Sequence, residues 1–121
     1  MTRKAVHRAL FHLDSGSRSA MLKTLRNIRN LLKDPRLEGR VRVELVVNGL
    51  GARLYKKSGA LAPEVAALAR EGVDFVLCAN TLAALGVDPR SLPPFVRIVP
   101  SAMGEIVLRA GEGWACIHPS P

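Results

Sequence analysis

One cysteine stands where a buried apolar run gives way to a helix-capping pair, and it is the residue best suited to chemistry. Cys78 follows the strand-favouring run 73–77 and precedes Asn80 and Thr81, which are residue types that cap helices. Backbone N–H groups and the positive end of a helix dipole favour the thiolate, the nucleophilic form of the thiol. The pattern predicts a nucleophilic Cys78; the alternative is a small buried hydrophobic residue, the usual role of a free cysteine.

Polar or turn-forming residues also follow the other apolar runs. Asp14, Asn48 and Ser101 each stand just after such a run, as Asn80 and Thr81 follow Cys78. If the runs are parallel strands, their carboxyl ends meet at one edge of a sheet, where ligands of α/β proteins bind. We therefore expect Cys78 to be catalytic, and Asp14, Asn48, Asn80, Thr81 and Ser101 to bind the substrate.

The elements that must position these residues alternate along the chain. The apolar patterns predict strands at 5–13, 41–47, 73–77, 95–99 and 114–117, and helices at 17–33, 63–71, 81–85 and 101–109. Residues 52–57 are interpreted as a short helix or an irregular basic loop. Strands separated by helices pair in parallel through right-handed crossovers.

We therefore predict a single α/β domain over residues 1–121. Its expected architecture is a three-layer sandwich with a five-stranded, mostly parallel sheet in the flavodoxin-like order 2-1-3-4-5. In that order the winding reverses between strands 1 and 3, so Asp14 is expected across a crevice from Cys78.

Composition narrows the class of protein. The chain of 121 residues is 48% hydrophobic and 23% charged, which is typical of a globular domain. The net charge of +8 fits attraction to nucleic acid, an acidic protein or small anions, but one Trp, one Tyr and three Phe leave little surface for base stacking. Nucleic acid is therefore an unlikely partner.

Other classes are excluded by what the sequence lacks. No uncharged run reaches the ~20 residues of a membrane span, and the N-terminus does not resemble a secretory signal. Two cysteines without such a signal indicate reduced thiols in the cytoplasm. There is no metal-ligand spacing of Cys and His and no nucleotide-binding fingerprint, so we expect no metal and no cofactor.

Several segments together resemble the DsrE/DsrF-like family of sulfur-relay and sulfur-oxidation proteins. They are Phe11-His12-Leu13-Asp14, the helix segment 25–32, Val46-Val47-Asn48-Gly49, the stretch 72–82 with its Cys-Ala-Asn-Thr-Leu motif, and Gly113-Trp114. The resemblance implies the fold described above and assembly into trimers or hexamers. It also implies that Cys78, at the position of the family's active cysteine, accepts sulfur as a persulfide and passes it on.

Two functions remain open at this point. The first is a cytoplasmic sulfur carrier or sulfurtransferase-like protein that uses Cys78, forms a homo-oligomer and meets donor and acceptor proteins of the sulfur relay. Asn80 and Thr81 would then donate hydrogen bonds to a sulfur anion, and Arg53, Lys56 and Lys57 would attract anionic donors. The second is a non-enzymatic basic module for RNA or an acidic protein, with a structural Cys78. Cys116 is expected to be buried in the last strand.

Overall fold

A parallel five-stranded sheet forms the centre of the computed structural model, which describes residues 5–119. Its strands are β1 (His7–Leu13), β2 (Val41–Val47), β3 (Asp74–Cys78), β4 (Val96–Val99) and β5 (Ala115–Ile117). Every neighbouring pair is parallel, and the spatial order is β4-β3-β2-β1-β5. The predicted α/β class and the strand positions are confirmed.

The predicted strand order is wrong. The expected order 2-1-3-4-5 placed β1 next to β3, whereas β2 pairs with both β1 and β3 and lies between them. Five consecutive residues of β2, Val43–Val47, are buried, as befits a central strand covered on both faces. The chain moves one strand at a time from β1 to β4 and then returns to pair β5 with the free edge of β1.

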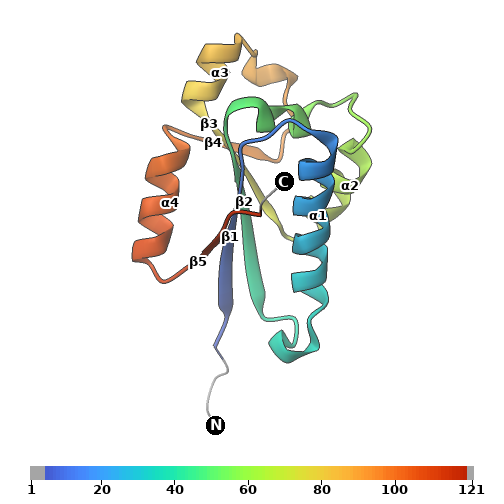
Figure 1. The fold of residues 1–121 in the computed structure, drawn as a ribbon, viewed down its shortest axis with the longest axis vertical. Coiled ribbons are helices and arrows are strands. Elements are labelled where there is room, and N and C mark those ends of the chain that lie inside the picture. The colour runs from blue at the N-terminus through green and yellow to red at the C-terminus, as the bar shows by residue number, and fades with distance from the viewer. Residues whose placement is uncertain (1–4, 120–121) are drawn as a thin grey trace.

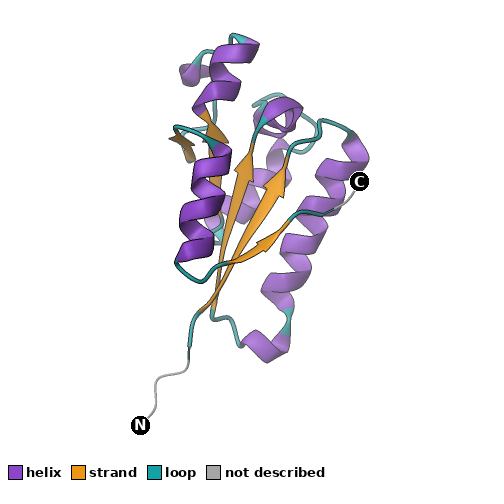
Figure 2. Cartoon of the chain, turned by 60° about the vertical axis from the view of Figure 1, so that its left-hand side comes forward, coloured by secondary structure: helices purple, strands orange, loops and turns teal. Residues whose placement is uncertain are grey.

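Helices cover both faces of the sheet. Helices α1 (Arg18–Lys33) and α2 (Ala62–Arg70) lie on one face, α4 (Ala102–Gly111) lies on the other, and α3 (Ala79–Leu85) stands at the carboxyl edge (Figures 1 and 2). Three 3₁₀ helices complete the chain: η1 (Pro35–Leu37), η2 (Gly49–Tyr55) and η3 (Pro89–Ser91). Helix η2 covers 52–55 of the segment 52–57 that the sequence left open, and Lys56 and Lys57 follow it. Within residues 5–119, no helix is long and apolar enough to cross a membrane.

The sheet separates two hydrophobic cores. The larger core packs alternate residues of β1, β2 and β3 against α1 and α2, and it includes Phe11, Ile28, Leu45, Leu68 and Phe75. The smaller core lies under α4 and contains Leu10, Val46, Val76, Cys78, Val99 and Ala102. Because alternate side chains of a strand point to opposite faces, Leu77 belongs to the first core and Cys78 to the second.

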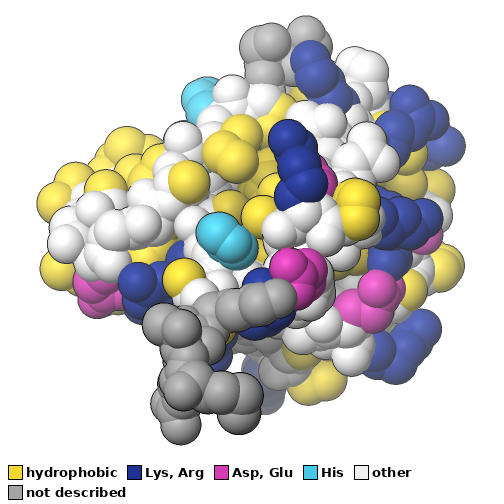
Figure 3. Space-filling model, turned by 90° about the horizontal axis from the view of Figure 1, so that it is seen from below, with side chains coloured by type: hydrophobic (Ala, Val, Ile, Leu, Met, Phe, Trp, Pro, Cys, Tyr) yellow, Lys and Arg dark blue, Asp and Glu magenta, His cyan; other side chains and the backbone are white. Residues whose placement is uncertain are grey.

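Helix α4 turns charged side chains toward the sheet and apolar ones toward solvent. Arg109 Nε lies 3.1 Å from Oε1 of Glu44, a fully buried residue of β2, and 3.2 Å from Oε2 of Glu105. The opposite side of the helix carries Met103, Val107 and Leu108, which are 54%, 69% and 65% exposed. Figure 3 shows hydrophobic side chains gathered at the end of the molecule where α4 lies, and basic ones at the other end.

Candidate functional site

The winding of the sheet reverses between β3 and β4. After β3 the chain stays on the face of α1 and α2, because Leu82 of α3 and Leu92 belong to the core on that face. After β4 the chain enters α4 on the opposite face. Parallel α/β sheets bind ligands at the carboxyl ends of strands where such a reversal occurs. At this reversal the two strands lead into Cys78 and Ser101.

Cys78 is the last residue of β3 and also occupies the N-cap position of α3. The helix thus begins directly after the cysteine, two residues earlier than predicted. The residue is 6% exposed, and it packs with Val76, Val99 and Ala102 in the smaller core. It nevertheless lines an open cavity of about 350 Å³, so the thiol is not enclosed by hydrocarbon on all sides.

Five of the six predicted site residues line this cavity, which we call the thiol cavity. Its walls come from the loop after β2, from α3 and from the start of α4. The lining residues are Asn48, Gly49, Cys78, Asn80, Thr81, Ala84, Leu85, Ser101, Ala102 and Met103. None of them carries a formal charge, so a ligand in the cavity meets amide and hydroxyl groups, backbone N–H groups and an apolar wall.

Thr81 connects two walls of the thiol cavity. The backbone N–H of Gly49 donates a hydrogen bond to Thr81 Oγ1 at 2.9 Å, which ties the loop after β2 to α3. Gly49 has a φ of 57°, a left-handed conformation that glycine adopts without strain. Thr81 is buried, and its hydroxyl also acts on the cysteine. Thr81 therefore lies inside α3 and links its neighbours, whereas the N-cap position belongs to Cys78.

The surroundings of Cys78 favour its thiolate. Burial raises the pKa of the thiol, but hydrogen bonding from the backbone N–H groups of Thr81, Ala102 and Asn80 and from the Thr81 hydroxyl outweighs burial and lowers the pKa below its ordinary value. These donors come from the starts of two helices, α3 and α4. A nucleophilic thiolate is therefore more populated at neutral pH than in an ordinary cysteine.

Ser101 positions one of those donors. Its Oγ accepts a hydrogen bond from the Gly104 N–H at 3.0 Å, which caps α4 as the sequence predicted. A Cβ atom at Gly104 would lie 2.8 Å from that Oγ, so a larger residue there would make the Ser101 side chain shift. By fixing the start of α4, the cap holds the Ala102 N–H near the sulfur.

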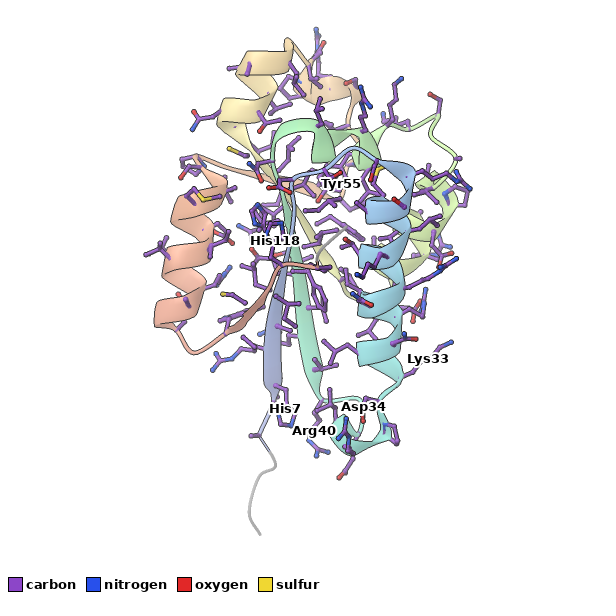
Figure 4. All side chains as sticks on the ribbon, viewed as in Figure 1. His7, Lys33, Asp34, Arg40, Tyr55 and His118 are labelled. Carbon is purple, nitrogen blue, oxygen red and sulfur yellow. The ribbon has the colours of Figure 1, made fainter. Side chains whose placement is uncertain are left out.

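Asp14 lies outside the thiol cavity, contrary to prediction. The expected crevice between β1 and β3 does not exist because β2 separates the two strands. Asp14 Oδ1 instead lies 3.2 Å from Nε2 of His118, in the segment that follows β5 (Figure 4). Its place at the end of β1 was predicted correctly, but not its neighbour.

His12 contacts the wall of the thiol cavity through Asn48, a contact that the sequence did not identify. Its Nε2 lies 2.6 Å from Oδ1 of Asn48, and its ring packs against that of His118 with 4.5 Å between centroids. Because an amide oxygen only accepts, Nε2 carries the proton in this arrangement. The position of His12 on the penultimate residue of β1 was the available signal, but only the correct strand order places it beside Asn48.

Two further groups of residues in this region lie away from the thiol cavity. Arg53, Lys56 and Lys57 line a separate cavity, and their attraction of anionic sulfur donors stays a prediction. Cys116 is exposed on the edge strand β5 instead of buried, and β1 and β2 separate that strand from β3. Among the described residues, no group of three or more His, Cys, Asp or Glu side chains is placed to hold a metal ion.

Comparison with known proteins agrees with the fold. The chain is similar to the solved structure of MTH1491, a protein of unknown function from Methanobacterium thermoautotrophicum, with 38% identity and a TM-score of 0.87 over 93% of this chain and 99% of that one. No curated protein matches the chain. The DsrE/DsrF-like family profile matches residues 9–119, and the members of that family are generally sulfur-relay proteins. The chain belongs to the DsrE/DsrF-like family.

Proposed function

We propose that this protein accepts sulfane sulfur as a persulfide on Cys78 and passes it to a second thiol. The observation that carries the proposal is the position of the cysteine: it lines an open, uncharged cavity, and amides from α3 and α4 lower the pKa of its thiol. A buried cysteine with only a packing role needs neither the cavity nor the hydrogen-bond donors. The reducing cytoplasm, which keeps both cysteines as thiols, is the proposed compartment.

The transfer needs no oxidant or reductant. The Cys78 thiolate attacks the outer sulfur of a donor persulfide, R–S–SH. The S–S bond of the donor breaks, its electron pair leaves with R–S⁻, and Cys78–S–SH forms. An acceptor thiolate then attacks the outer sulfur of Cys78–S–SH and restores the Cys78 thiolate. In both steps one S–S bond breaks while another forms, so the stabilised thiolate serves as nucleophile first and as leaving group second.

Neighbouring polar groups would hold the sulfur. Asn48 Nδ2 has no hydrogen-bond partner among residues 5–119, because the hydrogen bond with His12 uses Oδ1. With Asn80, Thr81 and Ser101 it supplies hydrogen-bond donors around a terminal sulfur anion. The residues that line the cavity include no cation that would select a doubly charged sulfur donor. The expected donors are therefore persulfides carried by proteins or small thiols.

We also propose that copies of the chain associate through α4, as a trimer or hexamer. The support is the orientation of this helix: the charged Glu105 and Arg109 face the sheet, while the apolar Val107 and Leu108 face solvent. Met103, on the same side of the helix, is 54% exposed and extends the apolar area. Such a patch is typical of a protein interface. Met103 belongs both to this face and to the thiol cavity, so a neighbouring copy would border the site.

A transfer assay with purified components tests the proposal. The reduced protein is loaded with a small-molecule persulfide, freed of excess donor and mixed with a labelled acceptor thiol. We expect sulfur to reach the acceptor from the wild type and from Cys116→Ser, and none from Cys78→Ser. Equal transfer by Cys78→Ser would refute the proposal. Transfer lost only in Cys116→Ser would assign the chemistry to the exposed thiol.

A further inference from the structure

A second cavity lies on the other side of α3 from the thiol. It has a volume of about 400 Å³ and is bounded by η2, by the residues that follow η2, and by the segment from α3 to η3. Its apolar lining includes Leu77, Leu85, Val87 and Leu92. We call it the η2 cavity. Leu85 lines both cavities, so α3 forms the wall between them.

The interior of the η2 cavity is built from fixed side chains. Tyr55 lines it and is 1% exposed, and its hydroxyl donates to the backbone oxygens of Val76 at 3.0 Å and Leu45 at 3.3 Å (Figure 4). Its ring packs edge-on against Phe75, with 6.0 Å between centroids. The tyrosine hydroxyl thus faces the sheet and leaves the ring as lining. The cavity therefore offers a ligand an apolar interior held by the central strands.

The rim of the η2 cavity carries three cations without counter-ions. Arg53, Lys56 and Lys57 line it and are exposed, and no acidic residue lines it. None of the three makes a hydrogen bond or ion pair through its side chain with another residue in the 5–119 range, whereas arginines such as Arg29, Arg36 and Arg90 are paired with carboxylates. A positive potential therefore remains at the mouth of an apolar cavity, which attracts an anion with an apolar body.

We propose that the η2 cavity binds a small amphipathic carboxylate, with its apolar chain against Leu85 and Leu92 and its carboxylate at Arg53, Lys56 and Lys57. A molecule of liquid water occupies about 30 Å³, and at a similar volume per non-hydrogen atom the cavity holds roughly a dozen such atoms. A medium-chain carboxylate such as octanoate fits this limit. The proposal is independent of sulfur transfer at Cys78.

The test is a ¹H–¹⁵N NMR titration of the full chain with octanoate, octanamide and octyl phosphate. Octanamide has the same chain and size as octanoate but no charge, so it separates the cationic rim from apolar binding alone. We expect saturable shifts with octanoate in 52–58, α3 and 87–92, and roughly tenfold weaker binding of octanamide. Tighter binding of octyl phosphate than of octanoate would overturn the carboxylate assignment in favour of a phosphate head group.

Matched variants complete the test. Lys56→Glu/Lys57→Glu should weaken octanoate binding by roughly tenfold or more, whereas the control Lys23→Glu/Lys33→Glu, with the same charge change on exposed positions of α1, should alter it less than about twofold. Cys78→Ser should leave the affinity unchanged. Equal effects of the two double variants, equal binding of octanamide, or no saturable shifts would each overturn the proposal. Spectra of the free variants show whether they remain folded.

Discussion

His12 Nε2 lies 2.6 Å from Asn48 Oδ1, so a histidine of β1 holds the amide that borders the thiol cavity. The bond uses the amide oxygen and leaves the Nδ2 hydrogens as donors. His12 is therefore a positioning residue, and Asn48 is the group that would meet the sulfur. Substitutions of the two residues should therefore have different effects. A change at Asn48 alters the cavity itself, whereas a change at His12 alters only how Asn48 is held.

Asn48→Asp should raise the pKa of the Cys78 thiol. The substitution keeps the shape of the side chain but places a negative charge in the cavity, and a nearby like charge disfavours the thiolate. The measurement is the pH dependence of Cys78 alkylation in a Cys116→Ser background. The control is Asn30→Asp, the same charge change on an exposed position of α1. An identical alkylation profile for Asn48→Asp and Asn30→Asp would contradict the assigned position of Asn48.

His12→Phe should slow sulfur transfer by roughly fivefold, which corresponds to the free energy of about one hydrogen bond. The change in the pKa of the Cys78 thiol should be smaller than in Asn48→Asp.

Thr81→Val should both destabilise the fold and weaken the thiolate. The substitution removes the oxygen that accepts from Gly49 N–H at 2.9 Å and one of the donors that lower the pKa of Cys78. We expect a loss of about 1–3 kcal/mol in the free energy of unfolding and an alkylation profile shifted to higher pH.

The matched control for Thr81 is Thr24→Val. Thr24 is also buried, and its hydroxyl donates to the Ala20 carbonyl oxygen at 2.9 Å, within α1 and away from the site. That variant should lose a similar amount of stability by urea denaturation and keep the wild-type alkylation profile. A shifted profile in both variants would show that the thiol responds to general destabilisation instead of to the Thr81 hydroxyl.

Glu44 should make the stability of the fold fall as pH rises. Burial first, and then the neighbouring Glu105 carboxylate, raise the pKa of Glu44 to about 8, although Arg109 acts in the opposite direction. In the unfolded chain a glutamate titrates near about 4.3, so the protonated form is favoured by folding. The resulting stability is present below pH of about 4.3 and is lost progressively as pH rises to about 8.

Glu44→Gln should abolish this fall, because glutamine cannot ionise. At pH 8 and above we expect the variant to be more stable than the wild type by an amount on the order of a few kcal/mol. Carboxylates with lowered pKa, such as Asp34 and Glu71, act in the opposite sense and at lower pH, so the difference between wild type and Glu44→Gln from about pH 5 to pH 8 reports on Glu44. Urea denaturation across that window is the measurement, with the half-exposed Glu64→Gln as control. The same slope in wild type and Glu44→Gln would contradict the interpretation.

Charge on the outer face of α4 should prevent self-association. Leu108→Glu places a carboxylate in the centre of the exposed apolar face, and a buried interface would have to desolvate it. We expect the wild type to elute as an oligomer and Leu108→Glu as a monomer in size-exclusion chromatography with light scattering. Leu50→Glu, at a site of similar character that is 50% exposed and lies on η2, should remain an oligomer. A monomeric wild type would refute the proposal that copies of the chain associate through α4.

Sequence patterns located the elements because each is coded locally. The helical repeat ending at Asp34-Pro35 gave the end of α1, and the run before Cys78 gave β3. The order of the strands is not coded in this way, because the same alternation of strands and helices allows β1 or β2 to stand beside β3. Because of that ambiguity, Asp14 was predicted to lie near the cysteine, and the bond between His12 and Asn48 was not predicted.

The residues after β2, β3 and β4 were correctly grouped for a simpler reason. Asn48 and Ser101 follow the carboxyl ends of β2 and β4, and Cys78 is the last residue of β3. The predicted order separates these three strands only by placing β1 between β2 and β3. The exposure of Cys116 could not be read from the sequence, because Ala115–Ile117 is as apolar as a buried strand and only its place at the edge exposes it.

The role of Cys78 as the thiol that carries sulfur can be tested by measuring the intact masses of single-cysteine variants after exposure to a sulfur donor. Reduced Cys116→Ser and Cys78→Ser are each incubated with polysulfide at neutral pH, and their intact masses are compared. We expect an added sulfur atom on Cys116→Ser that dithiothreitol removes, and little or none on Cys78→Ser. An unmodified Cys116→Ser beside a modified Cys78→Ser would contradict the role of Cys78.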